Sequence, residues 1–144
     1  MRAAFAAVAL ACAASAQAAD FRSVGENAVV MYDAPSRAST PVFVASRYYP
    51  VEVIVNLDAW VKVRDHTGTL SWVEKKALLE RRMVIVTAPA ADVRNRAEDG
   101  APVVFQATQN VALDLVGIVP GGWLRVKHAD GSNGYLKSSQ VWGL

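Results

Sequence analysis

The side chains best suited to bind a ligand in this chain are aromatic, because such rings offer a large, rigid contact area at a low cost in conformational entropy. The first half of the sequence carries Tyr32, Tyr48, Tyr49, Trp60 and Trp72, and Asp33 follows Tyr32 as a candidate partner for a cation. These six are the predicted ligand-binding residues. We expect Trp60, Tyr48 and Tyr49 to contribute most.

The second half of the sequence carries the aromatic residues Trp123, Tyr135 and Trp142. If Val93 aligns with Met31, Arg94 takes the place of Tyr32, so we expect the richer groove in the first half. Packing is the competing interpretation for every one of these rings. Trp72 and Tyr135 close hairpins, where cross-strand pairs form, and Trp142 is placed to seal the end of a barrel. The sequence leaves both interpretations open.

The polar residues do not indicate catalysis. Nucleophilic catalysis requires a nucleophile within hydrogen-bond reach of a base, and the single cysteine, Cys12, lies in the leader segment. His66 and His128 fall in matching hairpin turns, where we expect them to be exposed, and neither has the neighbours of a zinc site. No serine lies in a G-x-S-x-G motif. We therefore predict a protein that is not an enzyme and holds no metal or cofactor.

The first residues resemble an export signal. The stretch "MRAAFAAVALACAASAQAA" has one positive charge at Arg2, then an apolar run, then small residues. This order predicts a secretory signal peptide at residues 1–18, cleaved after Ala18, and hence a periplasmic or secreted protein. The run is too short for a good membrane span. Lipidation of Cys12 is the alternative, although Ala9 stands where the lipoprotein pattern prefers Leu.

Composition then limits the class of partner. The chain has 15 basic and 13 acidic residues, so loss of Arg2 leaves 14 against 13 and a net charge of +1. So small a charge gives no field that would attract nucleic acid. The mature chain would also contain no cysteine and hence no disulfide.

Short valine-rich runs separated by turns dominate the rest of the chain and predict an all-β protein. Those of the first half lie at 28–32, 41–45, 51–55, 60–63 and 71–74, and those of the second half at 91–95, 102–108, 113–119, 123–128 and 133–138. The hairpin "WVKVRDHTGTLSWV" at 60–73 returns as "WLRVKHADGSNGYL" at 123–136. In each copy two aliphatic residues alternate with Trp and basic residues, which predicts one core-facing and one outer face. The segment 73–83 suggests one helical turn, followed by a strand shared between the halves.

These runs resemble the bacterial SH3-like (SH3b) domain proteins. The residues that carry the resemblance include "VVMYDAPS" at 29–36, "DVRNRAEDGAPVVF" at 92–105 and "GGWLRVKHADGSNGYL" at 121–136. It implies two tandem small SH3-like β-barrels after the signal peptide, at 19–87 and 88–144, each five-stranded and partly open. Ser71 departs from the family pattern, which has Gly there, as Gly134 does in the second copy.

The resemblance also implies a function. Barrels of this family often accompany cell-wall hydrolases or act as targeting modules that bind peptidoglycan peptides or protein segments. We therefore expect a non-catalytic extracytoplasmic binding module that recognises such a peptide through aromatic grooves, with no membrane span and no nucleic-acid partner. The alternative is an adaptor that docks a partner protein along the edges of its sheets.

Overall fold

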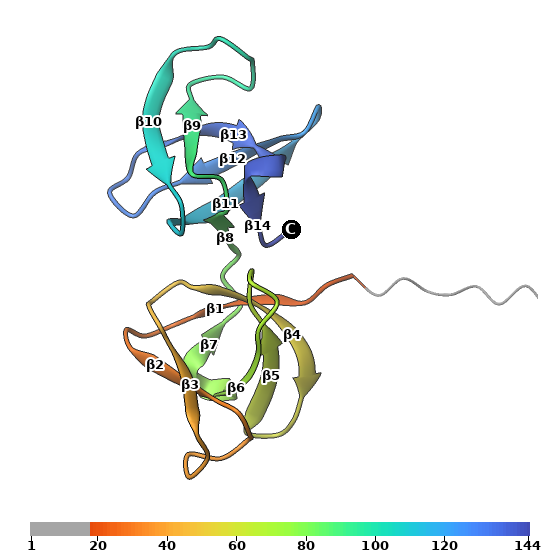
Figure 1. Ribbon diagram of the computed structural model, residues 1–144. Helices are drawn as coiled ribbons and strands as arrows, with labels where there is room; N and C mark the ends of the chain where they lie inside the picture. Colours follow the sequence, from red (N-terminus) through yellow and green to blue (C-terminus); the bar gives the residue numbers. More distant parts are fainter. Residues whose placement is uncertain (1–17) are drawn as a thin grey trace, which may run out of the picture.

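The computed structural model describes residues 18–144, and within them the protein is all-β, as predicted. The predicted signal peptide and Cys12 lie outside the described residues, apart from Ala18. Two seven-stranded antiparallel sheets follow one another along the chain (Figure 1). The prediction of two SH3-like units in tandem is thus confirmed at the level of architecture.

The first sheet runs in the order β3-β2-β6-β5-β4-β1-β7. Its strands are β1 (Phe21–Val24), β2 (Val29–Tyr32), β3 (Pro41–Ala45), β4 (Pro50–Asn56), β5 (Trp60–Arg64), β6 (Leu70–Glu74) and β7 (Leu78–Leu79). A single 3-10 turn, η1 (Lys75–Ala77), joins β6 to β7, at the place where the sequence predicted one helical turn.

The second sheet repeats this order as β10-β9-β13-β12-β11-β8-β14. Its strands are β8 (Met83–Val86), β9 (Ala90–Arg94), β10 (Val103–Thr108), β11 (Ala112–Val119), β12 (Trp123–Lys127), β13 (Asn133–Lys137) and β14 (Val141–Trp142), with a second 3-10 turn, η2 (Ser138–Gln140), before the last strand. The matching order shows that the hairpin recurs because the whole unit recurs.

Neither sheet is a closed barrel. In the first sheet β3 and β7 are the two end strands and do not pair with each other, and β10 and β14 are the end strands of the second. Each unit also has seven strands where five were expected. β1 lies ahead of the first run found in the sequence, and β7 and β14 have two residues each, too few for an alternating pattern.

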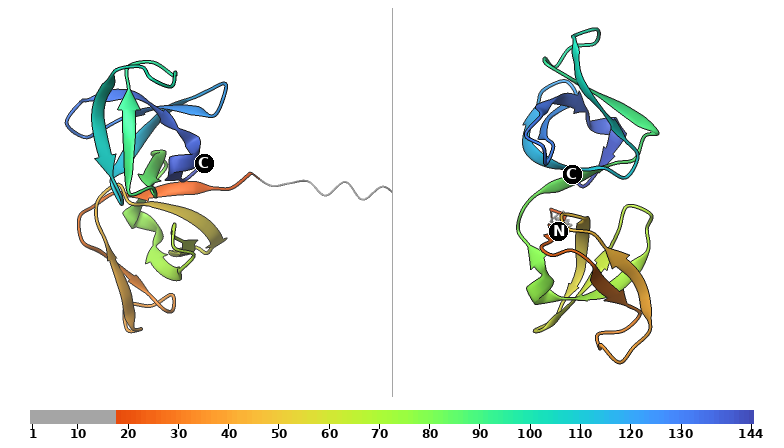
Figure 2. Two further views of the ribbon diagram at one scale, coloured as in Figure 1. Left: turned by 45° about the horizontal axis from the view of Figure 1, so that its top comes forward. Right: turned by 90° about the vertical axis from the view of Figure 1, so that its left-hand side faces the viewer.

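The expected shared strand belongs to one sheet only. β8 pairs with β11 and β14, both in the second sheet, and its Val84 and Val86 are buried in the core of that sheet. The chain therefore crosses between the sheets after Leu79 and before Met83, whereas the sequence placed the boundary at 87. Two views show the rolled sheets one above the other, with the single crossing between them (Figure 2).

Each sheet encloses its own core. Val61 and Val63 are buried in the first core, and their counterparts Leu124 and Val126 are buried in the second. The predicted inward-facing positions are thus confirmed. Trp60 is partly buried on the other face, whereas its counterpart Trp123 is only 8% exposed. The two Trp residues therefore have different surroundings, although the strands that carry them match.

Candidate ligand-binding sites

The structure places the six predicted site residues in two separate regions. Tyr32, Trp60 and Trp72 lie on β2, β5 and β6, and Asp33 follows β2. Tyr48 and Tyr49 lie in the turn between β3 and β4, at the junction with the second repeat. The predicted set is therefore not one site.

The first region is a shallow surface on the first repeat. The rings of Tyr32 and Trp60 meet edge to face, with centroids 5.8 Å apart and planes at 78°. Tyr32 lines a hollow of about 440 Å³ and Trp60 a hollow of about 410 Å³. Glu74 and Lys76 line both hollows, so we treat the two as one feature, the first-repeat groove. Trp72 pairs with Tyr32 across the strands but lines neither hollow.

Charged side chains frame the first-repeat groove. The Arg37 guanidinium donates to both carboxylate oxygens of Glu74, at 2.9 Å from Nη2 to Oε2 and through Nε to Oε1. Lys76 Nζ lies 3.6 Å from the same carboxylate. The hydrogen bonds from Arg37 are the main reason that the pKa of Glu74 is lowered. The groove thus offers both signs of charge beside two aromatic rings.

Asp33 has a structural role beside this groove. Its Oδ1 accepts the backbone N–H of Thr40 at 3.0 Å, and its own N–H donates to the Thr40 carbonyl at 3.0 Å. These two bonds close the loop between β2 and β3. Its predicted role as a cation partner stays a prediction.

Arg37→Gln should raise the pKa of Glu74 toward the ordinary value for a glutamate. A lowered pKa means that the folded state favours the carboxylate more than the unfolded chain does. The Glu74 carboxylate therefore stabilises the folded state at pH values above the ordinary glutamate pKa. This stabilisation is lost as the pH falls through the lowered pKa of the folded state. NMR titration of the Glu74 carboxyl carbon measures the shift. Arg64→Gln is the control, because Arg64 pairs with Glu52 and not with Glu74. If Arg64→Gln raised the pKa of Glu74 as much as Arg37→Gln does, Arg37 would not be the cause of the lowered pKa.

The second region is a cavity of about 860 Å³ between the two repeats, here called the junction cavity. Side chains of the first repeat and its linker line it on one side: Val42, Phe43, Val44, Arg47, Tyr48, Tyr49, Asp65, His66 and Arg81 are among them. The second repeat contributes Met83, Ile85, Asn110, Val111, Ala112, Asp114 and His128. Phe43, Arg81 and the second-repeat residues were not predicted, because no pattern along the chain reports a contact between repeats.

Tyr48 has an unusual backbone in the wall of this cavity. Its φ is +69°, in the left-handed region, and the matching residue of the second repeat, Asn110, has a φ of +70°. The match is fixed by hydrogen bonds, since Tyr48 N donates to Val24 O and Asn110 N to Val86 O. Asn tolerates this conformation, whereas a bulky residue there costs roughly 1–2 kcal/mol. The first repeat therefore keeps an aromatic ring where the backbone favours Asn.

Two arginines lie over the Tyr48 ring. The guanidinium carbons of Arg47 and Arg81 are 5.0 and 4.3 Å from the ring centroid. Arg81 also forms a side-on, two-hydrogen-bond pair with Asp114, with Nε–Oδ1 and Nη2–Oδ2 distances of 2.6 and 2.7 Å. The hydrogen bond to Asp114 is the main reason that the pKa of Arg81 is raised. Arg81 thus ties the linker to the second repeat.

Tyr49 holds a small cluster of rings at the same junction. Its hydroxyl lies 3.2 Å from His66 Nδ1, and its ring centroid lies 5.2 Å from that of Phe43. Burial raises the pKa of Tyr49, and the Asp65 carboxylate adds to the effect. His66, expected as an exposed turn residue, is instead partly buried, because this hairpin tip faces the second repeat.

The two histidines do not match each other in the structure. His128 N donates to Ser132 O, as Asp65 N does to Thr69 O, so His128 corresponds to Asp65. His128 Nδ1 accepts the N–H of Asp130 at 3.3 Å, as Asp65 Oδ1 accepts that of Thr67 at 2.9 Å. The turns therefore match, but the histidines stand one position apart.

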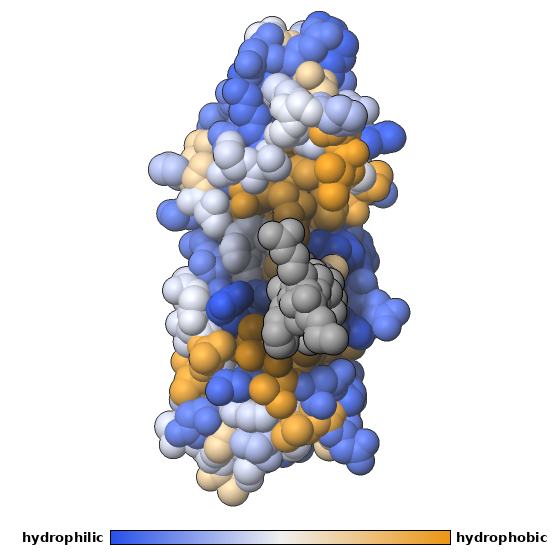
Figure 3. Space-filling model, turned by 90° about the vertical axis from the view of Figure 1, so that its right-hand side faces the viewer, coloured by the Kyte–Doolittle hydropathy of each residue, from blue (hydrophilic) through white to orange (hydrophobic). Residues whose placement is uncertain are grey.

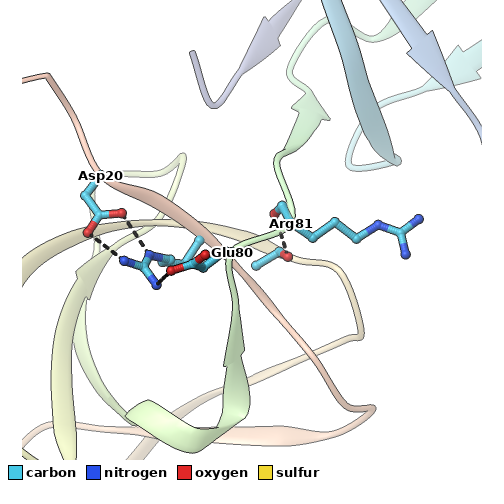
Figure 4. Close-up of polar contacts among 5 residues, drawn as sticks. Asp20, Glu80 and Arg81 are labelled. Atoms are coloured by element: carbon cyan, nitrogen blue, oxygen red, sulfur yellow. Dashed lines mark hydrogen bonds and ion pairs between the residues drawn. The ribbon is translucent and has the colours of Figure 1, made fainter.

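The junction also decides the place of Trp142. Its ring meets Phe21 of β1 edge to face, with centroids 5.2 Å apart, so it bridges the repeats rather than sealing one barrel. Around the linker, Arg22 pairs with Asp20 and Glu80, and Ser23 Oγ donates to the Arg81 carbonyl at 2.8 Å (Figure 4). These contacts fix the backbone from which the Arg81 side chain extends.

The second repeat has less open space where the first has its groove. Arg94, in the place of Tyr32, donates to the carbonyl of Ala101 at 2.7 Å. Lys137 Nζ lies 5.8 Å from the centroid of Trp123 and 2.8 Å from Asp99. The hollow that remains there is about 190 Å³. This agrees with the expectation that the first repeat has the richer groove.

Two further observations concern only residues 18–144. No three His, Cys, Asp or Glu side chains among them group closely enough to hold a metal ion. None of the helical segments described is long and apolar enough to cross a membrane.

Comparison with known proteins identifies the family. The family model described as the bacterial SH3 domain matches twice, at residues 25–80 and 87–143. The chain belongs to the bacterial SH3 domain family. The resemblance seen in the sequence is thereby confirmed, and with it the tandem repeat. Bacterial SH3 domains are non-catalytic binding modules and are typically extracellular.

Several solved structures resemble the tandem bacterial SH3 domains. NlpC2 and NlpC1 from Trichomonas vaginalis each share 16% identity at a TM-score of 0.40, over 89% and 95% of this chain and 49% and 50% of theirs. An NlpC/P60 family protein from Bacillus cereus gives the same identity and TM-score, over 85% of this chain and 55% of that one. The chain thus spans about half the length of these proteins. No curated protein matches its sequence.

Proposed function

We propose that this protein is a non-catalytic binding module that acts in the periplasm or after secretion and recognises cell-wall peptide or a protein segment through the first-repeat groove. The observation that carries the proposal is the edge-to-face pair of Tyr32 and Trp60 between two hollows. Two rings fixed against each other lose little conformational entropy when a ligand covers them.

The charges around the groove support a peptide as the ligand. Glu74 and Lys76 border both hollows, and Arg37, which pairs with Glu74, lines one of them. A peptide with charged groups of both signs can pair with these side chains while its apolar parts cover the rings. The second repeat, with its smaller hollow and its buried Trp123, is then a supporting unit for this activity.

Exposed strand edges favour a second candidate function, that of an adaptor for a partner protein. β3 is an end strand, and its Val42 and Val44 are 47% and 56% exposed. β10 is an end strand of the second sheet, and its Val103 and Val104 are each 48% exposed. On another face of the molecule apolar surface gathers over both repeats (Figure 3). An end strand such as β3 or β10, whose outer edge is unpaired, can accept an added strand from a partner protein.

Co-sedimentation with purified peptidoglycan sacculi tests the first function, with residues 19–144 as the protein. We expect the protein to pellet and Trp60→Ala to stay in the supernatant, because the substitution removes half of the ring pair. The melting temperature of Trp60→Ala should remain close to that of the parent protein. A large drop would show that Trp60 is a packing residue instead.

Val104→Lys is the matched variant for the edge hypothesis, because Val104 lies on the end strand β10, outside both candidate sites, and a charge on an end strand opposes strand addition. Groove binding predicts that Val104→Lys pellets like the parent protein. Loss of pelleting in Val104→Lys, with Trp60→Ala unaffected, would favour the edge. If the parent protein does not pellet, the cell-wall ligand is excluded and pull-downs for a protein partner follow.

A further inference from the structure

We propose that the junction cavity is a second binding site, which takes the carboxyl-terminal residue of a short peptide, and that Arg47 receives its carboxylate. The inference does not rest on the first-repeat groove. It rests on the size and lining of the cavity, on one arginine that lacks a carboxylate partner, and on the backbone of Tyr48.

The junction cavity has the dimensions and surface of a ligand site. At about 860 Å³ it lies within the range of roughly 300–1,000 Å³ that is usual for pockets that hold small ligands. Phe43 and Tyr49 supply rings from the first repeat, and Ile85 and Val111 supply aliphatic side chains from the second. Neither repeat encloses this space by itself. The ligand part that it fits is an apolar side chain.

The charges in the cavity leave one cation available. Arg81 and Asp114 neutralise each other through their side-on pair. Asp65 Oδ1 accepts three hydrogen bonds within its own turn, from Thr67 N, Thr67 Oγ1 and Thr69 N. Among residues 18–144 no carboxylate forms an ion pair with Arg47, whose guanidinium lies over the Tyr48 ring. A guanidinium stacked in this way keeps its N–H edge free for a carboxylate.

The conformation of Tyr48 is an independent observation that points to the same place. Its left-handed backbone disfavours a large side chain, and the second repeat has Asn at the matching position. Strained residues of this kind cluster at ligand clamps. Here the guanidiniums of both Arg47 and Arg81 lie over the ring, at 5.0 and 4.3 Å from its centroid. The strain therefore maintains the surface that presents Arg47 to the cavity.

A carboxyl-terminal residue fits this arrangement better than an acidic side chain does. Its carboxylate and its own side chain branch from the same Cα, so one residue can reach Arg47 and the adjacent rings of Tyr48 and Tyr49 together. Asp or Glu carries its carboxylate in place of an apolar side chain. Capture of terminal carboxylates is an established mode of peptide recognition.

The test uses the protein with both repeats, observed by ¹H–¹⁵N NMR during titration with acetyl-Ala-Leu. This dipeptide has a free terminal carboxylate. We expect shifts at Tyr49, His66 and Val111. The carboxamide acetyl-Ala-Leu-NH₂ should bind about tenfold more weakly, because the charge-assisted hydrogen bonds are lost. Arg47→Gln should weaken binding of the free acid by a similar factor and leave the affinity for the amide unchanged. Arg125→Gln, an exposed arginine on β12 outside both candidate sites, is the matched control and should change neither.

Several results would overturn the inference. They are no shifts at millimolar acetyl-Ala-Leu, equal affinity for acid and amide, unchanged affinity in Arg47→Gln, or shifts confined to Tyr32 and Trp60. Acetyl-Glu-Leu-NH₂ carries its only carboxylate on a side chain, and binding as tight as that of the free acid would exclude a terminal carboxylate. Trp60→Ala should bind acetyl-Ala-Leu normally, so failure here and failure of the sacculus experiment remain distinguishable.

Discussion

Leu113→Ala is expected to lower the free energy of unfolding by about 2–5 kcal/mol, the usual cost of removing a buried leucine side chain. Leu113 is fully buried on β11, in the core that it shares with Val84, Val86 and Leu124. Close-packed surroundings cannot fill the space that the substitution leaves, so the loss of apolar contact is accompanied by a cavity. Urea denaturation followed by tryptophan fluorescence measures the effect.

Ile118→Ala is the matched control on the same strand. Ile118 is 74% exposed, so its truncation removes little buried surface and should change the free energy of unfolding by no more than about 0.5 kcal/mol. Equal losses in the two variants would contradict the assignment of faces along β11.

Gly134→Ser is expected to destabilise the second repeat by about 1–3 kcal/mol, although Ser71 stands at the matching place in the first. A Cβ at Gly134 would lie 2.5 Å from the Arg94 carbonyl oxygen and 2.8 Å from Val93 Cγ1. In the first repeat the residue that corresponds to Val93 is Met31, and Ser71 Oγ contacts its Sδ at 3.5 Å. The flexible Met can make room, whereas the β-branched Val is stiff.

Gly117→Ala is the control for this prediction, because a Cβ at Gly117 meets no atom within 4 Å. Its melting temperature should equal or slightly exceed that of the parent protein, since Ala loses less conformational entropy than Gly on folding. A Gly134→Ser variant as stable as Gly117→Ala would show that β13 can move away from β9. The Ser71 departure from the family pattern would then have no structural consequence.

Local patterns were sufficient for the repeated unit. The alternation around Val61 and Val63 gave the correct core face, because neighbouring side chains of a strand point to opposite sides. The same pattern placed Trp60 and Trp123 alike, yet Trp123 is buried. Lys137 lies over the Trp123 ring and is held by an ion pair with Asp99, which is far from it in the sequence. The face of a residue could thus be predicted, but its exposure could not.

The candidate sites show the same division. The alignment of Arg94 with Tyr32 was correct. Arg94 on β9 pairs in register with Tyr135 on β13, and Tyr32 on β2 pairs in the same way with Trp72 on β6. The six predicted residues were nevertheless divided between two regions, because Tyr48 and Tyr49 face the other repeat. His66 became partly buried for the same reason. No periodicity along the chain encodes which hairpin tip will meet a second domain.

The sequence by itself determined the all-β class, the tandem repeat and its family, because these follow from alternation, turn residues and a pattern that occurs twice. Only the tertiary structure decided that the sheets stay open, that β8 belongs to the second sheet and that Trp142 bridges to Phe21. It also created the junction cavity. The physical reason is that contacts between the repeats depend on their relative orientation, which linker contacts such as Arg81–Asp114 fix and which local propensities do not specify.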